Sequence, residues 1–172
     1  AKRGVAGFLE GIREAAQRAG RIVTDMLAFS RRSTSEFTPV SINELLDTVV
    51  RIASSDYDLK KTYDFKKIKI IKQYDPNLPV IYCDRIEIEQ VLLNLIKNAT
   101  YGMAETPSTT EQLINLSSTN EGEVVRIEIA DTGPGMDEQT KRRIFEPFYT
   151  TKAPGDGVGL GLVICKMIAE EF

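Results

Sequence analysis

Glycine alternates with other residues near the end of the chain, in the run Gly155-Asp156-Gly157-Val158-Gly159-Leu160-Gly161-Leu162, and an apolar, helix-forming stretch follows over 163–168. Glycines at the start of a helix expose backbone N–H groups, and the helix dipole adds partial positive charge, so the run predicts a phosphate-binding turn. The run is not a dinucleotide-binding motif, because no strand precedes it, and it is not a P-loop, because Gly-Lys-Ser/Thr is absent. The alternative is a flexible hinge.

A second motif lies on a helix predicted from Asp84 to about Met103, where Asp84-x-x-Glu87 is a capping signature. Apolar residues at helical spacing form its buried side: Ile88, Val91, Leu92, Leu95, Ile96 and Ala99. Another face carries Gln90, Asn94, Asn98 and Tyr101. Two asparagines four residues apart can aim their amide oxygens at one point, which suits Mg²⁺. The alternative is a pair of ordinary polar residues on a half-buried helix.

A predicted strand over 124–130 ends in Asp131-Thr132-Gly133-Pro134-Gly135. The strand alternates apolar and charged residues, and we expect it to form a hairpin with 113–117 around Asn120-Glu121-Gly122. A carboxylate at the strand end can accept a hydrogen bond from an exocyclic amine, and the glycines let the backbone approach a flat ring. The alternative is a glycine turn with an aspartate cap.

Three aromatic residues, Phe145, Phe148 and Tyr149, follow within five positions on a stretch that contains Pro147 and ends near Lys152. This spacing predicts a loop pinned by hydrophobic anchors. Taken alone, the loop would be an interaction loop or a corner of the core.

The first part of the chain predicts one long helix over 5–32. Its apolar residues recur at alternating steps of three and four, as in a heptad seam: Val5, Phe8, Ile12, Ala15, Ala19, Ile22, Met26 and Phe29. Further apolar positions widen the face, which favours a four-helix bundle over a simple zipper. The alternative is a helix packed on its own domain.

After this helix we expect a polar linker over 31–38 that Pro39 ends, and a second helix that the capping box Ser41-x-x-Glu44 begins. Residues 68–71 and 80–82 are short β-prone runs. The order of helices and strands predicts an α/β sandwich, in which helices cover one face of one mixed sheet.

Composition excludes several classes of site. The chain has no histidine, which rules out Ser–His and Cys–His catalysis and histidine-ligated metals within it. A formal net charge of −3 argues against general nucleic-acid or membrane-surface binding. No apolar run is long enough to span a membrane, and neither Cys83 nor Cys165 has a CxxC partner. Because the chain starts at Ala1 without a signal pattern, we expect a piece of a longer protein.

The order of the four motifs resembles the catalytic ATP-binding domain of two-component sensor histidine kinases, in the superfamily that includes type II topoisomerases and MutL proteins (the GHKL or Bergerat superfamily). The resemblance covers 39–172, while 1–34 is similar to the second helix of the dimerisation and phosphotransfer bundle. It implies a Bergerat-type α/β fold. It also implies that the family's sheet continues beyond the glycine-box helix, so the domain is expected to be incomplete at its C-terminal end.

Residue by residue, the resemblance implies a nucleotide site. Asn98 would ligate the Mg²⁺ that bridges the ATP phosphates, with Asn94 beside it. Asp131 would read the adenine amino group, with Gly133 and Gly135 shaping that pocket.

The glycine box around the phosphates would comprise Gly157, Gly159, Leu160 and Gly161. Residues 145–158 would form a mobile ATP lid that Phe145 and Phe148 anchor. Lys152 would lie near the terminal phosphate, and Tyr101 stands where many relatives have a lysine.

The resemblance implies phosphoryl transfer from Mg²⁺-ATP to a histidine nitrogen and then to a response-regulator aspartate. The acceptor histidine is missing, so this chain is not sufficient for autophosphorylation. Asn94 stands where hydrolytic relatives have a glutamate, and an amide is no general base, which favours transfer over hydrolysis. The alternatives are a nucleotide-binding or dimerisation module without phosphotransfer, and a relative of the anti-sigma serine kinases.

The expected cofactors are ATP or ADP and Mg²⁺. The expected partners are a second copy, bound through the N-terminal helix bundle, and the receiver domain of a response regulator. We expect no contact with nucleic acid or with a membrane by this stretch, and a cytoplasmic location.

Overall fold

The structure is a computed structural model that describes residues 36–55, 65–104, 111–153 and 157–171, together with 11–13, 15–16, 19–20 and 23. The described positions before residue 24 are helical and exposed, as the predicted N-terminal helix requires. Ile12 and Val23 expose 56% and 54% of their surface. Of the predicted apolar seam, the structure describes Ile12, Ala15 and Ala19, which are exposed. The other seam positions lie outside the described residues, so the bundle stays a prediction.

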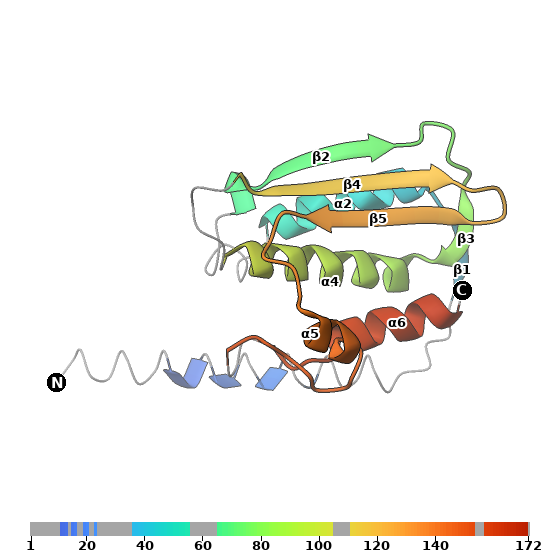
Figure 1. The fold of residues 1–172 in the computed structure, drawn as a ribbon. Helices are drawn as coiled ribbons and strands as arrows, with labels where there is room; N and C mark the ends of the chain where they lie inside the picture. Colours follow the sequence, from blue (N-terminus) through green and yellow to red (C-terminus); the bar gives the residue numbers. More distant parts are fainter. Residues whose placement is uncertain are drawn as a thin grey trace.

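The main sheet has three strands in the order β2-β4-β5 (Figure 1). β2 (Lys69–Tyr74) runs parallel to β4 (Leu113–Asn120), and β4 pairs antiparallel with β5 (Val125–Asp131). The sheet is therefore mixed, as predicted. The predicted hairpin is confirmed too, because the N–H of Glu121 donates to the carbonyl of Val124 at 2.9 Å.

A separate two-stranded ribbon corrects one prediction. β1 (Phe37–Val40) pairs antiparallel with β3 (Ile81–Asp84), although the sequence predicts a linker up to Thr38 that Pro39 ends. Pro39 lies opposite Tyr82 in a two-stranded ribbon, where a proline is tolerated because an edge strand needs fewer N–H donors. Burial of Val40, which is 2% exposed, ties the ribbon to the core.

Two long helices cover one face of the main sheet (Figure 1). They are α2 (Ile42–Ser55) and α4 (Arg85–Ala104), with the short helix η1 (Phe65–Lys67) beside α2. The predicted cap of α4 is confirmed, since a carboxylate oxygen of Asp84 accepts hydrogen bonds from the N–H groups of Ile86 and Glu87 at 2.8 and 3.2 Å.

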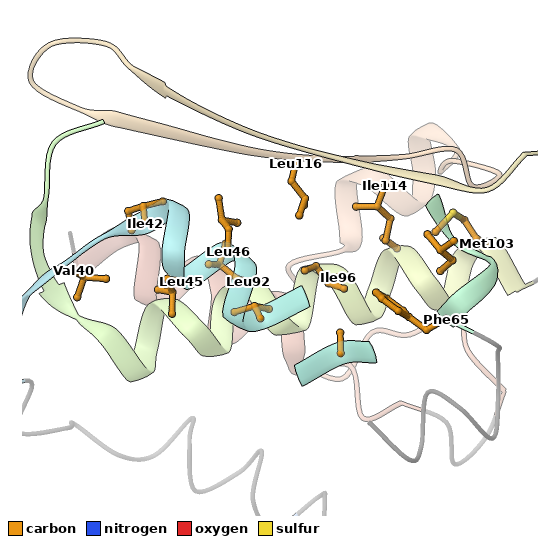
Figure 2. Packing of buried hydrophobic residues seen from close by; sticks show 14 of the residues in the cluster. Val40, Ile42, Leu45, Leu46, Phe65, Leu92, Ile96, Met103, Ile114 and Leu116 are labelled. Carbon is orange, nitrogen blue, oxygen red and sulfur yellow. The ribbon is translucent and has the colours of Figure 1, made fainter. Parts of the chain in front are cut away.

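The core fills the space between the sheet and these two helices (Figure 2). Ile114 and Leu116 of β4 point down onto Leu46 of α2 and Ile96 of α4, and all four are completely buried. Burying one such side chain contributes about 1.5–3 kcal/mol, so this layer fixes α4 against the sheet.

The other side of α4 meets α6 (Gly161–Glu171), while α5 (Glu138–Arg143) is a short exposed helix in the connection from β5. Leu160, Ile164 and Ile168 pack there against Ile88 and Val91 of α4. Because α4 is held on both sides, its polar face is fixed between the end of β5 and the start of α6. The predicted α/β sandwich is confirmed, with all of these helices on one side of the mixed sheet (Figure 1).

Candidate functional site

The three sequence motifs that predict a nucleotide site line one cavity of about 470 Å³. The cavity lies between α4, the end of β5, the loop after α5 and the start of α6. Its volume falls in the range of small-molecule sites. The predicted site residues that line it are Asn94, Asn98, Tyr101, Asp131, Gly135, Lys152, Gly157, Gly159, Leu160 and Gly161.

At one end of the cavity, Asp131 closes β5 with a carboxylate that is held in place. Its Oδ1 accepts a hydrogen bond from the N–H of Gly133 at 2.8 Å, which leaves the second oxygen able to accept from a ligand. A Cβ on Gly133 would lie 2.7 Å from that Oδ1. Gly133 does not line the cavity itself, and it touches the site through its N–H bond to Asp131.

The two asparagines of α4 both contact the glycine-rich side of the cavity. Asn98 Oδ1 accepts a hydrogen bond from Lys152 Nζ at 3.0 Å, and Asn94 Nδ2 lies 3.5 Å from the carbonyl oxygen of Gly161. The Lys152 ammonium is also 4.5 Å from the centre of the Tyr101 ring, within cation–π range. The predicted polar face of α4 is therefore brought to the predicted glycine turn.

The donor chemistry fits a magnesium ion that keeps most of its ligands from water and phosphate. Carboxamide oxygens are hard donors, and Mg²⁺ accepts one or two protein oxygens in such sites. Among the described residues, no group of three or more His, Cys, Asp or Glu side chains could hold a metal by itself. Asn98, with Asn94 beside it, would hold the ion, and the phosphates would complete its shell.

The glycine turn has the backbone that the sequence predicts for it. Gly159 has a φ of +73°, and its carbonyl accepts a hydrogen bond from the N–H of Phe148 at 3.0 Å. Leu160, Gly161 and Leu162 then line the cavity at the first turn of α6, where the N–H groups lack intrahelical partners. This end of the cavity can accept an anion.

The structure places both predicted anchors of the aromatic loop outside the cavity lining. Phe145 and Phe148 expose 46% and 60% of their surface and do not line the cavity. Tyr149 is the aromatic of this loop that lines the cavity. Its hydroxyl donates to Thr140 Oγ1 at 3.3 Å, and the Arg143 guanidinium lies 4.2 Å from its ring centre. The backbone N–H of Phe148 bonds to the glycine turn, while its ring is exposed.

Several lining residues were not predicted: Lys97, Met136, Thr140, Ile144, Tyr149 and Thr150. Tyr149 carried a signal, because it belongs to the same aromatic run and combines an apolar ring with a hydroxyl. Thr140 and Met136 carried none, since only the folded path of the α5 segment brings them to the cavity.

Residues 83–172 match the family described as "Histidine kinase-, DNA gyrase B-, and HSP90-like ATPase". The chain is 32% identical over 155 residues to the C4-dicarboxylate transport sensor protein DctS of Rhodobacter capsulatus, which is 90% of this chain and 22% of DctS. It is 33% identical over 153 residues to the sensory histidine kinase/phosphatase NtrB of Rhizobium leguminosarum bv. phaseoli, which is 83% of this chain and 38% of NtrB. The chain thus spans well under half of these relatives.

Solved structures agree with these relatives. Full-length ShkA in complex with AMPPNP matches with a TM-score of 0.76 and 29% identity, covering 95% of this chain and 33% of ShkA. The catalytic domain of the histidine kinase ThkA, in a nucleotide-free form, matches with a TM-score of 0.64 and 33% identity, covering 79% of this chain and 81% of that domain.

Within the described residues, no helix combines the length and the apolar character that crossing a bilayer requires.

The family match covers more than half of the chain and includes β5, α4, the glycine turn and the cavity between them. This chain therefore belongs to the histidine kinase-, DNA gyrase B- and HSP90-like ATPase family.

Proposed function

We propose that this chain is the ATP-binding catalytic portion of a sensor histidine kinase. It would transfer the γ-phosphoryl group of Mg²⁺-ATP to a histidine outside this sequence, and the group would pass from there to a response-regulator aspartate. The observation that carries the proposal is the convergence of Asp131, the Asn94–Asn98 pair and the glycine turn on one cavity. The sensor kinases among the relatives support it.

Each end of the cavity has a role in this reaction. Asp131 would accept a hydrogen bond from the adenine amino group, since Gly133 already orients its carboxylate. The first turn of α6 would bind phosphate oxygens through backbone N–H groups. These groups are preorganised, and phosphoryl transfer depends mainly on positioning and on charge stabilisation.

The cation side of the site would neutralise the transferred group. Bound Mg²⁺ supplies positive charge at the phosphate oxygens as the bond from the γ-phosphorus to its bridging oxygen breaks and the bond to nitrogen forms. Asn98 would hold the ion, and Lys152 can reach the same region from the loop. Asn94 has no basic group with which to activate water, which favours transfer to a protein nucleophile over hydrolysis.

The arrangement of the whole protein is part of the proposal. Residues 1–34 would be the second helix of a dimerisation and phosphotransfer bundle, and 39–172 the ATP-binding domain, to which β1 adds residues from Phe37 on. The partners would be a second copy and a receiver domain. ThkA supports the second partner, because it has been solved in complex with the response regulator TrrA and matches this chain with a TM-score of 0.70.

Nucleotide binding tests the site. Calorimetry with ADP and Mg²⁺ should give binding to the chain and at least about a tenfold loss in Asp131→Ala and in Asn98→Ala, the cost of a charge-assisted hydrogen bond or of a metal ligand. Asn115→Ala is the matched control, because Asn115 lies on β4 outside the cavity lining. Unchanged affinity in both site variants would remove the assignment.

A second measurement separates the kinase from a nucleotide-binding module. Radiolabelled ATP, the chain and a separately expressed helix with an acceptor histidine are mixed, and label on that helix is measured. Acid-labile label that depends on Asp131 supports the kinase. Nucleotide binding without any label supports the module.

A further inference from the structure

The Lys152 ammonium bonds to the oxygen to which the proposed function assigns a metal ion. Its Nζ donates to Asn98 Oδ1 at 3.0 Å, and that oxygen is the one that would ligate Mg²⁺. The two residues are 54 positions apart, and both line the cavity. One carboxamide oxygen is thus shared between a protein cation and the expected metal.

A ring contact, a backbone hydrogen bond and a neighbouring glycine position the Lys152 side chain. The ring of Tyr101, one turn further along α4, lies 4.5 Å from Nζ and attracts the charge. The N–H of Lys152 donates to Thr150 Oγ1 at 3.2 Å, which sets the local turn. A Cβ on Gly157 would lie 3.0 Å from Lys152 Cδ, so the missing side chain of Gly157 leaves room for the lysine stem.

The ammonium at 3.0 Å from Asn98 Oδ1 opposes the binding of Mg²⁺ to the same oxygen, because the two cations repel each other. A divalent ion binds its oxygens at about 2.0–2.1 Å, so it would lie very close to the lysine charge, and the low dielectric of a half-buried site strengthens the repulsion. Lysine can leave the Asn98 oxygen, because its stem is flexible and its ammonium can donate to phosphate oxygens instead.

We propose that Lys152 is an exchangeable cation of the nucleotide site, which occupies the Asn98 oxygen without metal and gives it up to Mg²⁺. This inference rests on the proposed function. Lysine would supply positive charge to a metal-free nucleoside diphosphate or triphosphate, so that the site binds nucleotide in two cation states. Lys152 thereby limits how strongly nucleotide affinity depends on the metal.

The measured quantity is the dissociation constant of ADP in EDTA divided by that in saturating Mg²⁺, both obtained by calorimetry on the full chain. In the unmodified chain the metal must displace Lys152, so the ratio is small. In Lys152→Gln the metal-free state loses its cation and the metal state loses its competitor. We expect the ratio to rise by about tenfold or more, the value of one charge-assisted hydrogen bond.

Matched variants isolate the position from the charge. Lys166→Gln makes the same charge change on α6, where Lys166 pairs with Glu170 outside the cavity, and should leave the ratio unchanged. Lys152→Arg keeps a cation and should keep the ratio near that of the unmodified chain. Tyr101→Leu removes the ring that holds the ammonium and should raise the ratio by a few-fold.

The outcomes are distinguishable. If neither the unmodified chain nor any variant binds ADP in either condition, the proposed function is wrong, and so is this inference. If ADP binds but the ratio is the same in the unmodified chain and Lys152→Gln, the exchange is wrong and the ATP site stands. Circular dichroism confirms that each variant is folded, and Lys152→Met replaces Lys152→Gln if that variant is not.

Discussion

The backbone N–H of Phe148 donates a hydrogen bond to the carbonyl oxygen of Gly159 at 3.0 Å, which ties the aromatic loop to the glycine turn. A Cβ at position 159 would lie 2.5 Å from the Phe148 carbonyl carbon and 2.5 Å from the Tyr149 carbonyl oxygen. Both are backbone atoms, so no side-chain rotation can relieve the contact. The approach of the two segments requires glycine here.

Gly159→Ala should therefore combine two costs. The φ of +73° is unfavourable for alanine by about 1–2 kcal/mol, and the backbone contact must open in addition. We expect the loop to move away from the turn and ADP affinity to fall by about tenfold or more. Calorimetry measures the affinity, and urea unfolding measures the free energy of unfolding of the same variant.

Gly122→Ala is the control for that variant. Gly122 has a φ of +88° in the β4–β5 turn, with no atom within 4 Å of an added Cβ. It should lower the free energy of unfolding by about 1–2 kcal/mol and leave ADP affinity unchanged. Equal losses of affinity in the two variants would mean that the close approach at Gly159 is irrelevant to the site.

Gly133→Ala tests whether Asp131 is positioned from outside the cavity. The new Cβ would lie 2.7 Å from Asp131 Oδ1, so the carboxylate must shift. We expect ADP affinity to fall by about three- to tenfold, which corresponds to one impaired hydrogen bond. IDP, whose base has an oxygen in place of the amino group, is the internal control, since it cannot donate to Asp131. Equal loss for ADP and IDP would show that Gly133 does not act through this carboxylate.

A half-buried polar cluster joins α2 to the ends of β2 and β4. Ser118, which is 3% exposed, donates to Asn43 Oδ1 at 2.7 Å, and Asn43 Nδ2 donates to the carbonyl of Asp75 at 2.9 Å. Ser118→Ala leaves the half-buried Asn43 Oδ1 without this donor and should lower the free energy of unfolding by about 1 kcal/mol in urea titrations. Ser117→Ala, on the other face of β4, should change it by less than about 0.5 kcal/mol.

A double-mutant cycle checks that the cluster is one unit. Because Ser118 and Asn43 share a hydrogen bond, Ser118→Ala combined with Asn43→Ala should cost less than the two single changes added together. Strict additivity would show that the two side chains contribute independently.

Local signals predicted the parts of the fold that local interactions determine. The cap of α4 depends on Asp84 and the next three residues, and it was readable from the sequence. The hairpin around Gly122 is equally local. The sequence does not predict β1, because this strand forms by pairing with β3, more than forty residues away. Pro39, taken locally, predicts the end of a segment and not a strand.

The site was predictable as a set of motifs and not as a set of contacts. The motifs contain many of the residues that line the cavity, but the bond from Lys152 to Asn98 joins positions that only the folded chain brings together. The same holds for the aromatic loop. Its spacing could not tell which ring faces inward, and the structure gives this place to Tyr149 and leaves Phe148 exposed.

Asp137 makes the start of α5 sensitive to acid. Its Oδ1 accepts a hydrogen bond from the N–H of Thr140 at 2.6 Å, and this cap lowers the pKa of the Asp137 carboxyl below its ordinary value of 3.8. A lowered pKa in the folded state means that the cap stabilises α5 fully well above pH 3.8. The contribution declines once the pH falls below 3.8, and it is lost as the pH passes through the folded-state pKa.

Titration by NMR of the carboxyl carbons tests this order of events. The Asp137 signal should titrate below pH 3.8, and the Thr140 amide should shift in parallel as the cap opens. In Asp137→Asn the side chain still offers an oxygen to Thr140 but cannot titrate, so the amide shift with that midpoint should disappear. Thr140 also receives the Tyr149 hydroxyl, so the Tyr149 signals should follow the same curve. A midpoint at or above 3.8 would show that the carboxylate does not cap α5 in solution.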